Sequence, residues 1–265
     1  MSARWLALRE PADRAARSTM LVTELRRHLP EKAPLVVHDL GCGTGSMLRW
    51  LAPLLPGPQR WTGHDRDQEL LATLSTSTPV RDSHGGTVTV DMHACNLAEL
   101  RPDELTGASL ITASSLLDML SAAELERLAT ACLAAECPLL LTLSVTGHVE
   151  LRPSDRQDER IRHAFNAHQR RITSDGRTLL GPDAVPAAIT LFAERGATVL
   201  SAPSVWQLRA GDRALINEWL TGWVGAACGH DPALARSARD YLRRRSAADG
   251  HLDVTVHHRD LLIMP

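Results

Sequence analysis

The stretch 35–51 reads LVVHDLGCGTGSMLRWL, and it decides the fold. Its first six residues form an apolar run that predicts a short buried strand, and its last six place apolar side chains at helical spacing. Between them, Gly41, Gly43 and Gly45 occupy alternate positions. Glycine adopts positive φ freely and lets a ligand approach the backbone where a Cβ would collide. The stretch therefore predicts a strand, a ligand-binding glycine loop and a helix, in that order.

Strands and helices alternate along the chain beyond this stretch. Apolar runs bounded by glycine, proline or polar residues predict further strands at 60–65, 87–92, 109–113, 138–144, 197–201 and 252–257. Apolar residues at helical spacing predict helices at 11–28, 68–74, 122–135 and 185–195, and helical segments between 214 and 245. In the first helix, Pro11 suits the first turn and Pro30 ends the run. This alternation predicts an α/β fold with a mainly parallel, doubly wound sheet.

Composition and charge limit the partners and the compartment. The formal net charge is −2, so no overall positive field attracts nucleic acid, and we disfavour a polynucleotide substrate. The five cysteines include no C-x-x-C pair, which indicates a reducing compartment and not a disulfide framework. The longest apolar run is too short to span a bilayer, and the N-terminus lacks the apolar run of a signal peptide. We therefore expect a cytoplasmic protein with no membrane contact, and a homodimer is compatible with the sequence.

The spacing of the glycines distinguishes between cofactors. The loop has the pattern G-x-G-x-G, whereas dinucleotide-binding loops have G-x-G-x-x-G and hold a pyrophosphate at the helix N-terminus. Asp39, two residues before the first glycine, would repel a pyrophosphate but suits a cofactor with a cationic amino-acid part. An acid followed by G-x-G-x-G at the end of the first strand resembles the motif of the class I S-adenosylmethionine-dependent methyltransferases. The alternative for the loop alone is a tight turn with an incidental glycine repeat.

This resemblance implies S-adenosylmethionine as the cofactor, and it implies a detailed fold. The expected fold is a seven-stranded, mainly parallel sheet, doubly wound, with the last strand antiparallel. We expect one methyltransferase domain over the 265 residues, with an N-terminal helix and an inserted and C-terminal helical lid. Its expected parts are a leading helix (about 1–34), a cofactor-binding core (35–148), a lid insertion (149–190) and C-terminal strands and helices (191–265).

The resemblance also implies roles for single residues. Asp65, at the end of the second strand, is expected to accept both ribose hydroxyls, unless it only caps the next helix. Asn96 stands where the family usually has an acid that holds the adenine amino group; its amide oxygen can accept that bond, or it only stabilises its loop. Arg17 is the candidate for the methionine carboxylate, against a surface ion pair with Asp13. The expected cofactor-binding residues are Arg17, Asp39, Gly41, Cys42, Gly43, Gly45, Asp65, Arg66, Asn96, Leu97 and Ser114.

Methyl transfer from a sulfonium needs alignment, exclusion of water and, for a hydroxyl acceptor, a base. Asp118, after the fourth strand, is expected to hold the acceptor or orient a base, or else to cap the next helix. His168, on the expected lid helix 161–171, is the first choice as general base because imidazole titrates near neutrality. The alternative is an exposed or packed histidine. Asn166 and Arg170 of the same helix are expected to bind the acceptor.

Three tryptophans stand in the C-terminal part of the chain. Trp206 is expected to line the acceptor pocket, whereas Trp219 and Trp223, one helical turn apart, are expected in the core. No metal ion is expected, because His163 and His168 do not share a helix face.

The sequence thus predicts an enzyme, a methyltransferase that acts on a small-molecule acceptor. Of the possible reactions we favour O-methylation. The chain has no Asn-Pro-Pro-aromatic or Asp-Pro-Pro-aromatic stretch, which argues against N-methylation of a nucleobase or glutamine. The alternatives are an RNA or protein methyltransferase that contacts its substrate through 152–171, and a non-catalytic protein that binds S-adenosylmethionine.

Overall fold

A computed structural model describes residues 2–30, 34–75, 79–246 and 251–265. The described residues form one seven-stranded sheet in the order β3-β2-β1-β4-β5-β7-β6. Its strands are β1 (Leu35–Leu40), β2 (Gln59–Asp65), β3 (Thr89–Ala94), β4 (Leu110–Ser114), β5 (Leu139–Arg152), β6 (Thr198–Leu208) and β7 (Asp253–Met264). Strand β7 runs antiparallel to both of its neighbours, and β1 to β5 pair in parallel. The expected sheet, with its antiparallel last strand, is confirmed.

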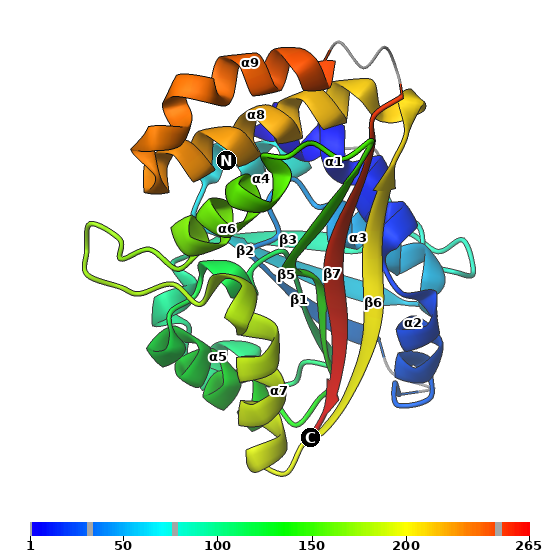
Figure 1. The fold of residues 1–265 in the computed structure, drawn as a ribbon. Helices are drawn as coiled ribbons and strands as arrows, with labels where there is room; N and C mark the ends of the chain where they lie inside the picture. Colours follow the sequence, from blue (N-terminus) through cyan, green and yellow to red (C-terminus); the bar gives the residue numbers. More distant parts are fainter. Residues whose placement is uncertain (1, 31–33, 76–78, 247–250) are drawn as a thin grey trace.

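Helices cover both faces of the sheet (Figure 1). They are α1 (Ala3–Ala16), α2 (Thr19–Arg26), α3 (Ser46–Leu51), α4 (Gln68–Ser75), α5 (Ala122–Ala134), α6 (Asp158–Gln169), α7 (Ala184–Glu194), α8 (Arg213–His230) and α9 (Ala235–Ser246). Buried apolar side chains of α2, α3 and α4 pack on one face, and those of α5 and α7 pack on the other. The prediction of a doubly wound sheet is therefore confirmed.

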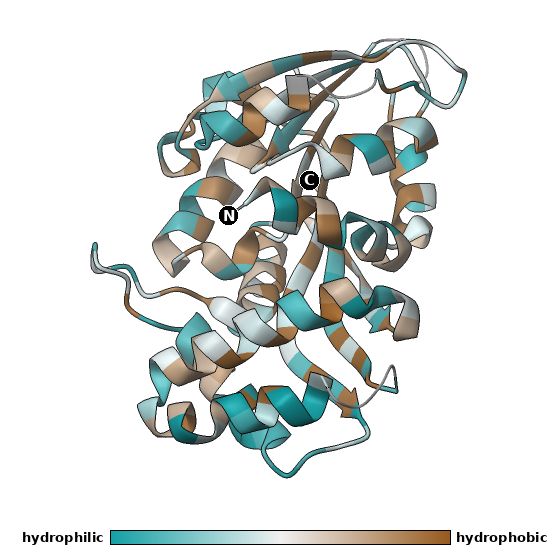
Figure 2. Ribbon diagram, turned by 90° about the horizontal axis from the view of Figure 1, so that it is seen from above, coloured by the Kyte–Doolittle hydropathy of each residue, from teal (hydrophilic) through white to brown (hydrophobic). Residues whose placement is uncertain are grey.

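The remaining helices, α1, α6, α8 and α9, form what we call the helical cap. They enclose a third apolar cluster with the far ends of the three longest strands, β5, β6 and β7. In Figure 1 the cap lies above these strands, with α8 and α9 stacked at the top. Figure 2 shows hydrophobic segments along the interior strands, whereas the peripheral loops are mainly hydrophilic. Among the described residues, no helix combines the length and the apolarity needed to cross a membrane.

The N-terminal segment differs from its prediction. Instead of one helix over 11–28, it forms α1 and α2, and Pro11 lies inside α1. The chain leaves the helical conformation at Arg17, whose ψ is 139°, and Ser18 begins α2 by accepting a hydrogen bond from Leu21 N–H. The carboxylate of Asp260 on β7 accepts the Ser18 N–H at 2.7 Å. A side-chain cap and a tertiary hydrogen bond thus divide a segment whose apolar spacing alone predicted one helix.

The segment expected as a lid insertion, 149–190, is divided between two parts of the molecule. Its first residues continue β5 as far as Arg152, because polar residues alternate with apolar ones there and pair with β7. Helix α6 belongs to the helical cap, where it packs on α8. Helix α7, in contrast, covers the central sheet next to α5.

Candidate active site

A cavity of about 320 Å³ opens at the carboxyl ends of β1, β2 and β4, where ligands bind in open α/β sheets. We call it the cofactor cavity. It is lined by Leu6, Arg9, Asp13, Arg17, Asp39, Gly41, Cys42, Gly43, Thr44, Ser46, Met47, Asp65, Arg66, Asp67, Leu70, Cys95, Asn96, Leu97, Ala98, Ser114, Ser115, Leu116, Met119, Leu120, Glu124 and Arg177. These residues include every expected cofactor-binding residue except Gly45.

The glycine loop forms the floor of this cavity. Gly41 and Gly43 have φ of +70° and +53°, a conformation that side chains with a Cβ rarely adopt. Gly45 has φ of +84° and begins α3, but a Cβ there would lie 2.4 Å from a methyl group of Leu74 on α4. The expectation that Gly45 approaches the cofactor is therefore corrected: this glycine permits close packing of α3 against α4.

Asp65 ends β2 at the rim of the cofactor cavity. Its two carboxylate oxygens accept hydrogen bonds from the backbone N–H groups of Gly43, at 2.8 Å, and Asp67, at 2.9 Å. The side chain is half-buried, and each oxygen retains a lone pair for a further donor. The carboxylate is thus fixed in position and can still accept two hydroxyl groups. The cap of α4 is supplied by Asp67, which accepts from Glu69 N–H.

Asp39 lies at the bottom of the cofactor cavity and is 2% exposed. One carboxylate oxygen accepts the Thr112 hydroxyl at 2.9 Å, and the other is buried with no partner among the described residues. Burial raises the pKa of Asp39 to about 7, although the Thr112 hydroxyl and the Arg17 guanidinium oppose this shift. An orphaned buried oxygen beside a cavity fits a cationic donor supplied by a ligand.

Arg17 extends from the end of α1 into the same cavity. Its guanidinium donates to the hydroxyl oxygens of Ser114, at 3.0 Å, and Ser46, at 3.1 Å, and lies over the ring of Trp50 at 5.3 Å. The alternative ion pair between Arg17 and Asp13 is absent among the described residues, because Arg9 pairs with Asp13 instead. Because Arg17 is buried and has no carboxylate partner among the described residues, it can receive a ligand carboxylate.

Asn96 follows β3 and lines the cavity with Leu97. Its amide oxygen accepts Ala98 N–H at 3.2 Å, and its amide nitrogen donates to the Glu99 carboxylate at 3.0 Å. Asn96 therefore stabilises its own turn, which is the alternative role that the sequence allows. The amide oxygen has a second lone pair, so a contact with adenine stays a prediction.

A second cavity, of about 190 Å³, adjoins the first. We call it the acceptor cavity, and it is lined by Trp5, Arg9, Ser115, Asp118, Met119, Leu143, Val145, Gly147, His148, Val149, Phe165, Asn166, Gln169, Trp206, Trp219, Trp223, Val256, His257 and His258. Arg9, Ser115 and Met119 line both cavities, so these residues mark where the two meet. The lining is mainly aromatic and aliphatic, which favours an apolar ligand.

Arg9 organises the boundary between the two cavities. Its guanidinium pairs with the Asp13 carboxylate at 2.9 Å and donates to the Ser115 hydroxyl at 2.8 Å. The same carboxylate accepts the Trp206 indole N–H at 3.0 Å, and Arg9 lies 5.1 Å from the centre of that ring. Trp206 is thus held as a wall of the acceptor cavity, and a contact between it and an acceptor stays a prediction. We did not predict this role for Arg9, although the i, i+4 spacing of Arg9 and Asp13 signals the pair.

Asp118 reaches the acceptor cavity from the turn after β4. Burial raises the pKa of its carboxyl to about 6, with Arg9 and Arg171 opposing the shift. The amide of Gln169 on α6 lies 3.5 Å from one of its oxygens. The alternative role as cap of α5 is wrong, because Ser121 caps that helix. Asp118 therefore remains a candidate base or acceptor ligand.

Helix α6 turns one face to the acceptor cavity and a neighbouring face to α8. Asn166 lies on the first face: its amide nitrogen donates to Gly147 C=O at 2.8 Å, and its oxygen is buried with no partner in the described part of the chain. His168 lies on the second face, where a Cβ at Gly229 would contact its ring at 3.5 Å. His168 lines neither cavity.

Arg170 also lies away from both cavities. Its guanidinium forms a surface ion pair with Asp183, with one nitrogen 2.6 Å from a carboxylate oxygen. The helical period explains both corrections, because each step of one residue turns the side chain by about 100°. His168 and Arg170 thus lie outside both cavities, whereas Asp118 and Asn166 line the acceptor cavity, and a catalytic or acceptor-binding role for either of these two stays a prediction.

Trp219 and Trp223 of α8 belong to the core, as expected, but they also line the acceptor cavity. Their rings stack with centres 5.1 Å apart. The indole nitrogen of Trp223 and one ring nitrogen of His258 are buried without partners among the described residues. Together with the amide oxygen of Asn166, they add unpartnered polar atoms to a mainly apolar wall.

Comparison with known proteins finds similarity of structure alone. No protein-family model matches the chain, and no curated protein matches it. A cyclopropane-fatty-acyl-phospholipid synthase-like protein from Lactobacillus casei is 16% identical, with 100% of this chain and 94% of that chain covered and a TM-score of 0.53. An S-adenosylmethionine-dependent methyltransferase from Geobacter sulfurreducens, in complex with S-adenosyl-L-homocysteine, is also 16% identical, with 100% and 98% covered and a TM-score of 0.48.

At such identities the likeness concerns the fold. Together with the strand order and the antiparallel β7, it identifies the Rossmann-like fold of the class I S-adenosylmethionine-dependent methyltransferases.

Proposed function

We propose that the protein is an enzyme that binds S-adenosylmethionine in the cofactor cavity and methylates a small, mainly apolar molecule in the acceptor cavity. The observation that carries this proposal is the buried, unpartnered carboxylate oxygen of Asp39 beside the glycine loop, at the bottom of the cofactor cavity. A dinucleotide would bring a pyrophosphate to this loop and would meet a negative charge there. A cofactor with an amino-acid part brings an ammonium group instead.

The cavity offers a partner for each part of this cofactor. Asp39 receives the ammonium group, and Arg17 receives the carboxylate as a charge-assisted pair. Asp65, fixed by two backbone N–H groups, accepts the two ribose hydroxyls. Leu97 packs against the adenine, and Asn96 accepts a hydrogen bond from its amino group. When bound, the cofactor supplies an electrophilic methyl group on a sulfonium.

The side chains of the protein contribute to the reaction by positioning the acceptor and by removing its proton. Trp206, Phe165 and the stacked pair Trp219 and Trp223 exclude water and hold a flat acceptor between them. Asp118 removes the proton of a hydroxyl acceptor as the methyl group is transferred. With a pKa of about 6, its carboxyl is ionised at neutral pH and remains a stronger base than an ordinary aspartate.

The volume of the acceptor cavity limits the size of the acceptor group. A cavity of roughly 150 Å³ lined by aliphatic and aromatic side chains binds benzene, so about 190 Å³ suits one substituted ring. The structurally similar Lactobacillus casei protein is a cyclopropane-fatty-acyl-phospholipid synthase-like protein, and an apolar cavity also suits an alkene. Methyl transfer to carbon is therefore our second candidate, and O-methylation of a ring hydroxyl is the first.

The five cysteines are free, which supports the expected reducing, cytoplasmic setting. An RNA or protein substrate is disfavoured because carboxylates already pair with the arginines Arg160, Arg162 and Arg170 of the segment 152–171 and offset their positive charge.

Incubation with labelled S-adenosylmethionine and a panel of phenols, matched anisoles and alkenes tests the proposal. We expect label in the phenols and in neither control class. Label in the alkenes alone would favour the second candidate, and label in none of them, with the cofactor bound, would contradict a small apolar acceptor.

A further inference from the structure

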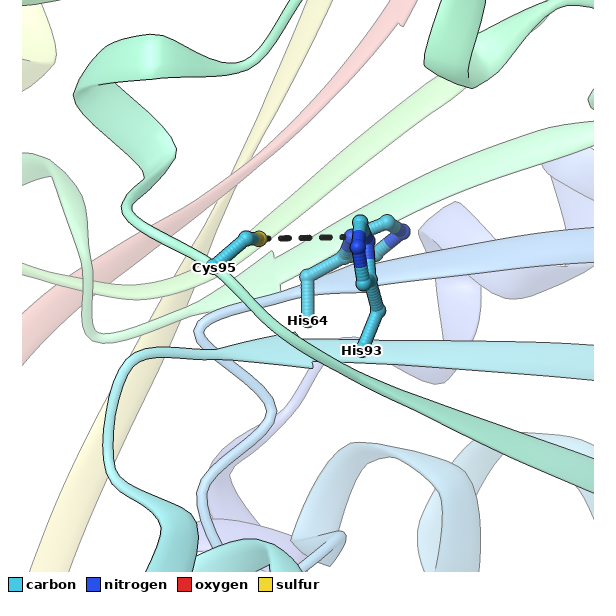
Figure 3. A group of neighbouring side chains, drawn as sticks. All are labelled: His64, His93 and Cys95. Carbon is cyan, nitrogen blue, oxygen red and sulfur yellow. Dashed lines mark hydrogen bonds between the residues drawn. The ribbon is translucent and has the colours of Figure 1, made fainter.

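A cluster of nitrogen and sulfur ligands lies beside the cofactor cavity, at the ends of β2 and β3. Figure 3 shows the side chains of His64, His93 and Cys95 directed toward one another. Their potential ligand atoms all lie within 4.8 Å of one another. We propose that His64, His93 and Cys95 form a Zn²⁺ site, with solvent in the fourth position.

The pairing of the strands brings the three residues together. His64 and His93 are directly opposed partners in the parallel pair β2–β3. Cys95 follows His93 by two residues and therefore points to the same face of the strand. The hydrogen bond from Cys95 N–H to Asp65 C=O, at 3.0 Å, extends the pairing to this position. The backbone thus fixes all three ligands before any ion binds.

The distances fit tetrahedral zinc. Zn–N and Zn–S distances of about 2.0 and 2.3 Å at a tetrahedral angle separate the two ligand atoms by about 3.5 Å. The distance between the Cys95 Sγ and the His64 Nδ1 is 3.6 Å. The rings of His64 and His93 have centres 5.4 Å apart and lie edge to face, which leaves a nitrogen of each free to face the thiol.

A second histidine orients the first. His38 on β1 places its Nδ1 2.9 Å from the Nε2 of His64. When His64 donates its Nε2 proton to His38, its Nδ1 carries a lone pair toward Cys95, which is the tautomer that a metal requires. Zinc-binding histidines usually donate their other ring nitrogen in this way.

The surroundings suit a site with one open position. His64 is 1% exposed, Cys95 is half-buried and His93 is exposed, so an ion can enter from the side of His93. Two nitrogens and a thiolate favour Zn²⁺ over Mg²⁺ or Ca²⁺, which prefer oxygen ligands. Zinc would join the edge strand β3 to β2 and fix the turn that begins at Asn96. That effect on the cofactor rests on the proposed function, but zinc binding itself does not.

Titration of the full-length protein with Zn²⁺, and with Co²⁺ as a spectroscopic substitute, tests the site in the absence of cofactor. We expect one equivalent to bind, and Co²⁺ to give the charge-transfer absorption of a cobalt–thiolate bond. Cys95→Ser should abolish that absorption. Cys95→Ser and His93→Ala should each weaken Zn²⁺ binding by more than about 100-fold, since loss of an outer partner alone costs about 10- to 100-fold.

The matched controls are Cys228→Ser and His84→Ala, which change a distant cysteine and an exposed histidine. Both should bind Zn²⁺ as the wild type does. Because His93 is exposed, His93→Ala should fold, and circular dichroism checks this. No zinc binding by the folded wild type would overturn the site.

Zinc binding that survives Cys95→Ser would also overturn it. Such binding would point to a second group of ligands, His148, Glu150 and His257, which holds no cysteine. Binding of S-adenosylmethionine without zinc binding refutes this inference alone, whereas zinc binding without cofactor binding refutes the proposed function alone.

Discussion

At the scale of single residues, Asp39 has one buried carboxylate oxygen with no partner among the described residues. Its folded-state pKa of about 7 lies above the ordinary value, so between about pH 4 and pH 7 the folded protein holds a proton that the unfolded chain has lost. The stability of the protein without ligand therefore falls as pH rises through this range. The same charge becomes favourable when a cationic ligand group binds beside it.

Asp39→Asn should consequently have opposite effects on stability and on cofactor binding. The amide keeps the acceptor for Thr112 and removes the buried charge, so we expect the ligand-free protein to gain about 1–3 kcal/mol at about pH 8. Cofactor affinity should fall by at least about 10-fold. Urea unfolding and calorimetry measure the two quantities. A variant that is less stable than the wild type at this pH would refute the account of the buried charge.

Asp118 provides the second residue-scale prediction. The methylation rate at low acceptor concentration should rise with pH through an apparent pKa of about 6, because only the ionised carboxylate accepts a proton. Asp118→Asn should lower kcat by about 100-fold or more and remove this dependence. His168→Asn is the matched control and should leave both unchanged. A loss of the acidic limb in His168→Asn alone would restore the role that the sequence first suggested.

How far single residues can be read from sequence depends on what positions them. Asp39 and Asp65 lie at the carboxyl ends of β1 and β2, and parallel strands bring these ends to one edge of the sheet, so the sequence places both residues there. His168 and Arg170 lie on a helix whose rotation about its axis is set by packing against α8, which the sequence does not specify. The register of β2 and β3 brings together His64, His93 and Cys95. Because the sequence does not specify this register, no sequence motif predicts the cluster.

At the scale of elements, Gly45 allows the start of α3 to pack closely against α4. Gly45→Ala combines an unfavourable positive φ with a Cβ 2.4 Å from Leu74, and we expect a loss of about 2–5 kcal/mol of stability. Gly107→Ala is the matched control, because Gly107 has φ of +79° and nothing within 4 Å of an added Cβ. It should cost about 1–2 kcal/mol. Equal losses in the two variants, measured by thermal or urea unfolding, would show that packing against Leu74 is unimportant.

Asp260 links three elements at the centre of the molecule. Its buried carboxylate accepts the N–H groups of Ser18, at the start of α2, and Leu143, at an irregularity of β5, at 2.7 and 2.8 Å. Asp260→Ala leaves one buried and one half-buried N–H group unpaired and should cost about 3 kcal/mol or more. The exposed Asp240→Ala should cost less than about 1 kcal/mol. If urea unfolding finds Asp260→Ala as stable as this control, the link is not structural.

The ends of helices and strands are predicted less well from sequence patterns than the elements themselves. Strand β5 is predicted only as far as Ser144, where its apolar run ends, but pairing with β7 extends it to Arg152. Conversely, the single helix predicted over 11–28 is divided by Ser18 and its contact with Asp260. In both cases a tertiary partner overrides the local signal.

At the scale of the whole molecule, the fold follows from two features of the sequence, the alternation of strands with helices and the glycine loop. The helical cap does not follow, because α1, α6, α8 and α9 come from distant parts of the chain and share one apolar cluster. The acceptor cavity lies between this cap and the sheet. Its shape therefore depends on how the cap helices pack on the strands, which no sequence motif specifies. The cofactor cavity, built on strand ends, is the part that sequence predicts best.

The central claim is that the cofactor cavity binds S-adenosylmethionine. Calorimetric titration of S-adenosylmethionine and its demethylated product into wild-type protein, Asp65→Ala and the exposed control Asp91→Ala tests it most directly. We predict one equivalent of each ligand bound by the wild type and the control, and affinity at least about 10-fold lower in Asp65→Ala, which loses two charge-assisted hydrogen bonds. Binding of neither ligand to the wild type, with binding of a nicotinamide dinucleotide instead, would contradict the claim.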